Sequence, residues 1–262
     1  VWTGPTAACA VVRKRAGEPA SDGCEAVVER EWLVDEVLRG AEVVACPDVD
    51  CVRDGAVYVV HAAAWSADAR NAAKRLGLAL RRNGYRSALV HLSDEGGAVD
   101  DFYEPWPVIW RQYYSEALAE RWGAKLRFLP LGYASGHRRL APTTTPASTR
   151  PLAWFFGGDA RPPRREKLRA LGEAVPRGLV HATARSTTGR SWRDDVWSAA
   201  TVSDVTSAAA LCPAPAGFES AETFRVWEAL EAGCVPLLEA AQEAYFTKYA
   251  KRLEVALNVD AR

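Results

Sequence analysis

Two charged residues near the end of the chain, Arg225 and Glu228, have the types and the spacing to bind a nucleotide. They lie three positions apart in "ETFRVWEALEAG", a run of good helix formers, so they share one face of the expected helix. An arginine at a helix start can hold a diphosphate with two donors, and a glutamate one turn later can accept hydrogen bonds from ribose hydroxyls. Ser220 precedes the run and is expected to cap the helix. The alternative is an ordinary ion pair on a helix surface.

A second candidate is the turn in "WFFGGDARPPRREK", where Gly157 and Gly158 join an expected strand to an expected helix. Backbone amides at a helix start favour anions, and Arg164 adds positive charge there. The turn lacks the G-x-G-x-x-G pattern of a dinucleotide site and the lysine of a P-loop. We therefore expect a phosphate group near this turn. The alternative is an arginine-rich helix face in solvent.

Carboxylates for acid–base chemistry occur in "HLSDEGG", where Asp94 and Glu95 follow a buried strand. The two glycines after them let the backbone turn sharply. A carboxylate at this place can act as a general base or bind hydroxyl groups. The alternative is an acidic turn in solvent or a helix cap.

The elements that must position these residues alternate along the chain. Short apolar runs such as "AVYVVHA", "SALVHLS" and "LAWFFGG" are separated by amphipathic runs such as "ADARNAAKRLGLALRRNG" and "YYSEALAERWG". This alternation predicts the α/β class, with parallel sheets covered by helices on both faces. We expect two Rossmann-like domains whose sheets face a central cleft. Ligands of such sheets bind beyond the carboxyl ends of the strands, where the candidates lie.

The composition predicts four segments in a chain of 262 residues. Residues 1–55 are expected to be irregular or partly helical, and residues 56–135 to form the first Rossmann-like domain. Residues 136–150 are rich in Pro and Thr with almost no large apolar side chain, so we expect a linker. Residues 151–262 are expected to form the second domain.

Composition argues against several classes of protein. Lysine plus arginine equals aspartate plus glutamate at 33 each, which does not favour a nucleic-acid binder. No stretch approaches the roughly 18 apolar residues of a membrane-spanning helix. The four histidines are scattered, so we expect no protein-bound metal. Among six cysteines, Cys46 and Cys51 could close a small loop; the alternative is free buried thiols. Because the chain begins at Val1 and contains no methionine, we expect it to be a fragment.

The segment from Leu89 to Leu238 resembles a known family. The pattern "R-x-x-E-A-L-E-A-G-C-V-P-L" after a strand ending in "C-P" is similar to the C-terminal signature of exostosin-like glycosyltransferases and of ribitol xylosyltransferase-type enzymes. The pieces "HLSDE", "FYEPWPVIWRQYYS", "RFLPLGY" and "LAWFFGG…RR" match in the same order. The resemblance implies a GT-B fold and transfer of a sugar from a nucleotide donor to an acceptor hydroxyl, with inversion.

The resemblance also implies residue roles. The donor would sit mainly on the second domain, with Arg225 at the diphosphate, Glu228 at the ribose, and Ser220 and Thr223 near the phosphates. The expected donor is a UDP-sugar, and no other tightly bound cofactor is expected. The acceptor would be a glycan or glycoprotein held by the first domain. Nucleic acid is not an expected partner.

Three further expectations concern the base, the compartment and the chain end. Inverting transfer needs a base near the acceptor hydroxyl, for which Asp94 and Glu95 are candidates. Family members work in the secretory pathway, in the Golgi lumen, held to the membrane by an N-terminal helix that lies outside these residues. Relatives continue past Leu238 with further strands and a helix that crosses back to the first domain. We therefore expect the second domain to be truncated.

Two alternatives from other classes stay open. One is a sugar-nucleotide-binding or glycan-binding module of the same fold that has lost catalysis. The other is a Rossmann-type enzyme that uses a nicotinamide cofactor. The missing G-x-G-x-x-G pattern, and the lack of an acidic residue about 20 positions beyond such a loop, argue against the second.

Overall fold

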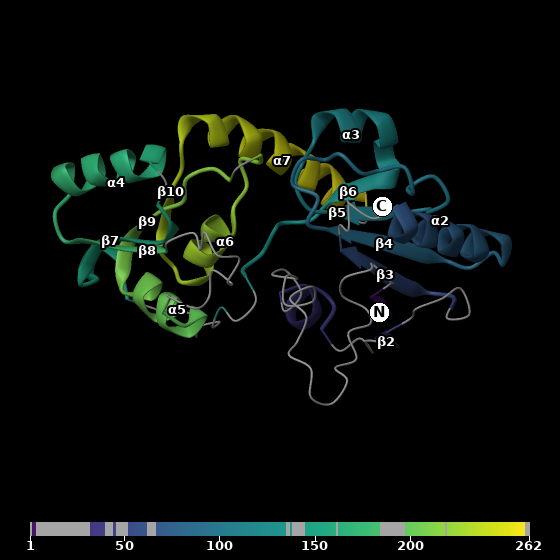
Figure 1. Ribbon diagram of the computed structural model, residues 1–262, viewed down its shortest axis with the longest axis horizontal. Coiled ribbons are helices and arrows are strands. Elements are labelled where there is room, and N and C mark those ends of the chain that lie inside the picture. Colours follow the sequence, from purple (N-terminus) through teal and green to yellow (C-terminus); the bar gives the residue numbers. More distant parts are fainter. Residues whose placement is uncertain are drawn as a thin grey trace. The chain divides into compact units, whose positions relative to one another are not determined.

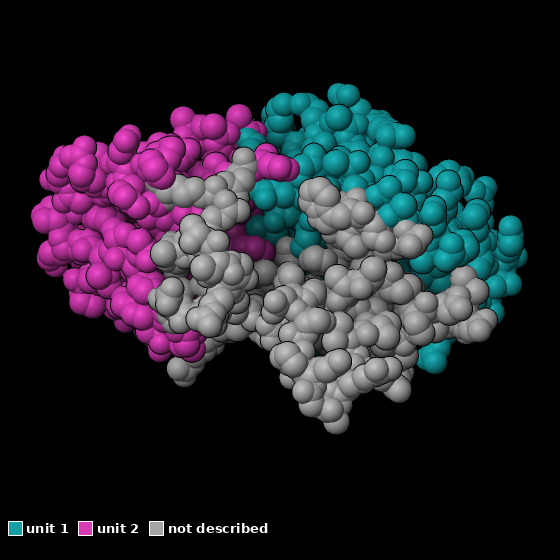
Figure 2. Space-filling model, viewed as in Figure 1, with its two compact units in different colours: residues 1–131, 245–262 teal, residues 132–244 magenta. Residues whose placement is uncertain are grey.

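The chain forms two compact units in the computed structural model (Figure 2). Unit 1 comprises Val1–Leu131 and Tyr245–Arg262, and unit 2 comprises Gly132–Ala244. The residues that the structure describes are 2–3, 32–39, 44–45, 52–61, 67–134, 137, 145–160, 162–183, 197–217 and 219–259.

Unit 1 contains a parallel sheet with the strand order β2-β1-β3-β4-β5-β6 (Figure 1). Two short strands, β1 and β2, extend this sheet at one edge, and each has two residues. The strands are β1 (Trp2–Thr3), β2 (Val44–Ala45), β3 (Ala56–His61), β4 (Ser87–Leu92), β5 (Ile109–Arg111) and β6 (Leu126–Phe128). The helical segments are η1 (Leu33–Val37), α2 (Ala67–Arg82), α3 (Glu116–Trp122) and η3 (Gly123–Lys125).

The apolar runs that predicted strands form the core of unit 1. Val59 of β3 and Val90 of β4 are buried and pack in one cluster with Leu33 of η1. Leu76 and Leu80 bury one side of α2. The helix predicted over this run is therefore confirmed, and these leucines form its buried face.

Unit 2 contains a second parallel sheet with the strand order β10-β9-β7-β8. Its strands are β7 (Leu152–Asp159), β8 (Gly178–Thr183), β9 (Ala209–Pro213) and β10 (Val235–Leu237). Its helical segments are η4 (Ala147–Thr149), α4 (Pro162–Ala174), α5 (Ala199–Ser207) and α6 (Phe224–Glu231). Both sheets are parallel throughout, so the predicted α/β class with two Rossmann-like units is confirmed.

Helices cover both faces of the unit 2 sheet, with α4 on one side and α5 on the other (Figure 1). Phe156 of β7 packs with Leu168 of α4. Phe155, its neighbour in the strand, packs with Ala229 of α6 and with Val202 of α5. Alternate residues of one buried strand thus serve two cores, because successive side chains point to opposite faces.

A disulfide joins Cys212 in β9 to Cys234, which directly precedes β10. No pairing of these two cysteines was predicted from the sequence. No spacing rule predicted this pair, because its residues lie 22 positions apart and become close only when β9 and β10 align. Cys46 and Cys51 lie outside the described residues.

The end of the chain differs from the expected boundary of the second domain, residues 151–262. The long helix α7 (Ala240–Val259) begins in unit 2, and its part from Tyr245 onward belongs to unit 1. In unit 1 the Tyr245 hydroxyl accepts a hydrogen bond from the Tyr114 backbone N–H at 2.8 Å. The helix was expected within the second domain, because the sequence from 240 shows a helical pattern but not which core the helix joins. None of the helices in the described part of the chain is long and apolar enough to span a membrane.

The predicted linker, residues 136–150, also contributes to unit 2. His137 is buried, and its Nδ1 lies 2.9 Å from the hydroxyl of Ser203 on α5. Arg150 is buried too, and its Nη1 donates to the carbonyls of Ala209 and Ala232 at 3.0 and 3.2 Å. A polar residue can be buried when it satisfies backbone carbonyls, so low hydrophobicity did not exclude packing here.

Candidate functional site

The strand order of unit 2 reverses between β7 and β9. In an open parallel sheet, the connections from two such strands leave in opposite directions and open a crevice at their carboxyl ends. Here β7 ends in Gly157, Gly158 and Asp159, and β9 ends in Pro213. Several of the predicted residues come together at this place.

Arg225, in the first turn of α6, reaches the end of β7. Its Nε donates to the Gly157 carbonyl at 2.9 Å, and its guanidinium carbon lies 5.1 Å from the centre of the Phe156 ring. Neither Nη group has a hydrogen-bond partner among the described residues. Burial lowers the pKa of Arg225 from its usual value, while the nearby Glu228 carboxylate raises it. One edge of the guanidinium is thus fixed, and the other can bind an anion.

Gly158 makes room for this arginine. A Cβ built on Gly158 would lie 1.9 Å from Nη2 of Arg225, far inside van der Waals contact. Gly158 also has a φ of +138°, a conformation that only glycine adopts readily. Gly158 therefore has two roles here: it adopts this backbone conformation and it leaves space for a charged side chain.

Arg164 of α4 contacts the backbone at the end of β7 and in the loop after β9. Its Nη1 donates to the Asp159 carbonyl at 3.2 Å, and its Nη2 donates to the Ala216 carbonyl in the loop after β9. These bonds fix the loop after β9 relative to the end of β7. The predicted phosphate contact of Arg164 stays a prediction, and its observed bonds are to the protein.

Glu228 lies one turn after Arg225 on α6. Its Oε1 accepts a hydrogen bond from the Ala134 backbone N–H at 3.2 Å. No hydrogen bond to its Oε2 occurs among the described residues. One carboxylate oxygen therefore positions the segment after Leu131, and the other can accept a bond from a ligand.

The start of α6 differs from the prediction. Thr223, not Ser220, occupies the N-cap position, and Ser220 instead accepts a hydrogen bond from the Glu222 N–H at 3.1 Å. The Thr223 hydroxyl makes no capping bond, and its Oγ1 is buried without a partner in the described part of the chain. Glu222, which the sequence did not single out, is 1% exposed and accepts a bond from Trp227 Nε1 at 2.8 Å. The buried carboxylate holds the turn that delivers Arg225.

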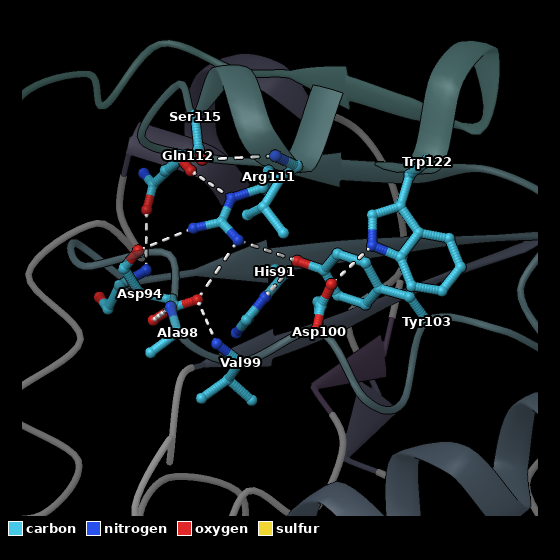
Figure 3. A network of polar contacts seen from close by, with 12 residues as sticks. His91, Asp94, Ala98, Val99, Asp100, Tyr103, Arg111, Gln112, Ser115 and Trp122 are labelled. Carbon is cyan, nitrogen blue, oxygen red and sulfur yellow. Dashed lines mark hydrogen bonds and ion pairs between the residues drawn. The ribbon is translucent and has the colours of Figure 1, made fainter. Parts of the chain in front are cut away.

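The acidic pair lies in unit 1, at the carboxyl end of β4. Asp94 is buried and pairs with Arg111, whose Nη1 lies 3.3 Å from Oδ2 (Figure 3). The Asp94 carboxylate also accepts bonds from the N–H groups of Ala98 and Val99 at 3.2 and 3.1 Å. These contacts hold the loop after β4 closed on itself. The proposal that Asp94 is a base stays untested, but its carboxylate is already bound on several sides.

Arg111 is 1% exposed, and protein groups surround its guanidinium. Its Nε donates to the Gln112 carbonyl at 2.9 Å, and its Nη2 donates to the Asp94 carbonyl at 2.7 Å. The Tyr103 hydroxyl lies 3.4 Å from Nη1 and 2.6 Å from His91 Nδ1 (Figure 3). Burial raises the pKa of Tyr103, and the charge of Arg111 opposes that shift. The sequence missed this network, although a charged residue ending an apolar strand was a signal.

Glu95 is the more exposed of the two candidate bases, with a partly buried side chain. Two positions before it, Ser93 has a left-handed φ of 61°, as does Tyr113 after the neighbouring strand, at 58°. The Ser93 N–H donates to Gln112 Oε1 at 3.1 Å, which supports the first of these conformations. Such backbone positions are uncommon for non-glycine residues and occur often at functional sites.

No three histidine, cysteine, aspartate or glutamate side chains gather in the described ranges as they would to hold a metal ion. The predicted site residues thus divide between the units. Unit 2 brings together Gly157, Gly158, Arg225 and Glu228 with Arg164, and unit 1 contains Asp94 and Glu95.

Comparison of the sequence with protein-family models gives no match, and comparison with curated proteins gives none either.

Proposed function

We propose that this protein is a glycosyltransferase that binds a nucleotide-sugar donor in unit 2 and transfers the sugar to a hydroxyl of a glycan or glycoprotein. The observation that carries the proposal is the position of the Arg225 side chain. The guanidinium is fixed through Nε, its two Nη groups have no hydrogen-bond partner among the described residues, and a glycine makes room for them at the strand-order reversal of a parallel sheet. The resemblance of the surrounding sequence to exostosin-like enzymes supports the same assignment.

In this proposal Arg225 binds the donor diphosphate and stabilises it as it departs from the sugar. Glu228 Oε2, which has no hydrogen bond in the part of the chain that the structure describes, accepts a bond from a ribose hydroxyl, since Glu228 follows Arg225 by one turn. Glu95, in unit 1, is the candidate for the base that takes the proton from the acceptor hydroxyl.

The test is a calorimetric titration with UDP and with GDP. Replacing Arg225 by alanine is expected to weaken binding of the preferred nucleotide by about 1–3 kcal/mol, the range for a lost charge-assisted bond. Arg165→Ala serves as a matched control, because Arg165 is exposed on α4. Equal affinities for the wild type and Arg225→Ala would contradict the assignment.

A second function, a nucleotide-sugar-binding module without catalysis, is favoured by the bonds of Asp94. One of the two candidate bases is an ion-paired carboxylate inside the fold. Hydrolysis or transfer of a UDP-sugar by the purified protein would support the enzyme. If the protein binds the nucleotide without turnover, and Glu95→Gln leaves the binding affinity unchanged, the result would support the module.

We also propose that the protein works in the secretory pathway. The Cys212–Cys234 disulfide supports an oxidising compartment, because glutathione and thioredoxin keep most cytosolic thiols reduced. Mass spectrometry after alkylation without reductant tests this. In the native protein Cys212 and Cys234 should stay joined in the disulfide and remain unalkylated.

A further inference from the structure

One buried amide side chain joins the starts of two helices in unit 2. Gln242, in the first turn of α7, is 0% exposed. Its Oε1 accepts a hydrogen bond from the Glu239 backbone N–H at 2.7 Å, as the glutamine of a capping box does at a helix start. Its Nε2 donates to the Ala221 carbonyl at 2.7 Å, in the turn before α6. The same side chain therefore caps α7 and holds the turn that leads into α6.

The start of α6 depends on support of this kind. The helix has eight residues, Phe224–Glu231, and its N-cap residue Thr223 makes no side-chain capping bond. A helix of this length is marginal by itself, so contacts with the rest of the fold must hold its ends. The bond from Gln242 to the Ala221 carbonyl supplies such a contact from a separate element.

The turn that Gln242 holds sets the place from which the Arg225 side chain extends. Arg225 follows Ala221 by four residues, and its Nε reaches the Gly157 carbonyl of β7 at 2.9 Å. If the turn moved, the first residues of α6 and the Arg225 side chain would move with it. A shift of about 1 Å is enough to cost binding where a charged group must meet its ligand in a fixed geometry.

We propose that Gln242 is a positioning residue of the donor site: it fixes the turn before α6 and thereby holds Arg225 in place for a diphosphate. This inference rests on the proposed donor site at Arg225. Gln242 does not contact the donor, because its side chain is buried and both of its polar atoms are bonded to backbone groups. Its effect on nucleotide binding therefore passes through the side chains that α6 carries, and chiefly through Arg225.

The experiment measures UDP affinity by calorimetry in two variants, at about pH 8, where a carboxyl is normally ionised. Gln242→Met keeps the length of the side chain and loses both hydrogen bonds. Gln242→Glu keeps the acceptor for the Glu239 N–H and puts a second oxygen against the Ala221 carbonyl, so it loses only the bond to the turn. Both variants are expected to weaken UDP binding by roughly 2- to 10-fold, the equivalent of one lost hydrogen bond.

Two further measurements show whether Gln242 acts on the site or only on stability. Ser198→Ala is the matched control, because it removes the cap of α5, another helix of unit 2, where Ser198 Oγ accepts from the Thr201 N–H at 3.1 Å. It should destabilise the fold in urea and leave UDP affinity unchanged. In an Arg225→Ala background, Gln242→Met should change UDP affinity by less than about twofold, since residues that act through one another are not additive.

Hydrogen exchange followed by mass spectrometry tests the turn without any nucleotide. Peptides that cover residues 219–231 should exchange faster in Gln242→Met than in the wild type, because the bond to the Ala221 carbonyl is gone. Peptides that cover α5 should exchange at the same rate in both proteins. Equal exchange over residues 219–231 would overturn the role of Gln242 in holding this turn.

The outcomes separate this inference from the proposed function. If Arg225→Ala weakens UDP binding while both Gln242 variants bind UDP as the wild type does, the positioning role is overturned and the donor site stands. If Gln242→Glu keeps full affinity and Gln242→Met does not, the cap of α7 carries the effect, and the role of the bond to Ala221 is overturned. An undiminished Gln242→Met effect in the Arg225→Ala background would overturn the action through Arg225. If Arg225→Ala itself leaves UDP affinity unchanged, the donor site is overturned.

Discussion

The two units place an arginine at the same kind of position and use it in opposite ways. Arg111 ends β5 in unit 1 and Arg225 meets the end of β7 in unit 2, so both lie at the carboxyl edge of a parallel sheet. Arg111 is 1% exposed and bonds to Asp94, Gln112 and Tyr103. Arg225 is fixed through Nε alone among the described residues.

The difference shows that location does not separate a structural arginine from a binding one. The carboxyl edge of a parallel sheet collects polar side chains in either case. What distinguishes the two is how many donors the protein leaves unused. A guanidinium has five N–H groups, and every direction that the protein occupies is lost to a ligand.

The first prediction concerns Arg111, the buried arginine of unit 1, and its contribution to stability. Arg111→Met keeps the volume but leaves the Asp94 carboxylate buried without its charge partner. We expect a loss of about 3–5 kcal/mol in the free energy of unfolding, measured by urea denaturation. Arg81→Met is the control, because the Arg81–Glu104 pair is exposed and should contribute less than about 1 kcal/mol. Similar losses in both variants would contradict the structural role of Arg111.

The second prediction concerns the covalent support of the unit 2 side. The Cys212→Ala, Cys234→Ala double variant removes a bond that closes a loop of 22 positions between β9 and the segment before β10. That loop contains α6, which carries Arg225. We expect unfolding to become easier by about 3 kcal/mol in urea. Reductant should shift the unfolding midpoint of the wild type and not of the double variant; an equal shift in both would refute the assignment.

A third change sharpens the contrast by disturbing Arg225 without replacing it. Gly158→Ala puts a methyl group where Nη2 now lies, so the Arg225 side chain must move away from its present position. UDP affinity is expected to fall by about 1–3 kcal/mol, as for the loss of the arginine itself. Gly172→Ala is the matched control, since its Cβ would be 3.4 Å from Trp154 in ordinary contact distance. An unchanged UDP affinity in Gly158→Ala would show that UDP binding does not depend on the present position of the Arg225 side chain.

Sequence periodicity predicted the longer strands and helices of both units, but neither the short strands β1 and β2 nor the partners of each charged residue. Gly158 was recognised at a strand end and Arg225 at a helix start, and the order of the strands brings them together. The same reasoning treated Asp94 as available, because its partner Arg111 lies 17 positions away and meets it only across the β4–β5 pair. Ion pairs between strands depend on register, which local patterns do not contain.

The buried ends of the expected linker show a second limit of sequence reasoning. Arg150 and His137 lie in a stretch of low hydrophobicity, yet both are buried because they satisfy polar groups of unit 2. A partner such as the Ala232 carbonyl at the end of α6 becomes visible only after the helix is placed. Composition therefore predicted a linker, whereas specific hydrogen bonds pack His137 and Arg150 into unit 2.

The smallest predicted effect concerns His137, whose environment lies beside the candidate site. Burial lowers the pKa of His137 below its usual value of 6.5, against the opposing charges of Glu228 and Glu231. The unfolded chain therefore binds a proton at a higher pH than the folded protein does. Stability should be full above about pH 6.5 and should decline as the pH falls below that value. In His137→Gln this part of the decline should disappear, so the difference in unfolding free energy between the two proteins should change between pH 7 and pH 5. Parallel curves over that range would show that His137 does not resist protonation in the fold.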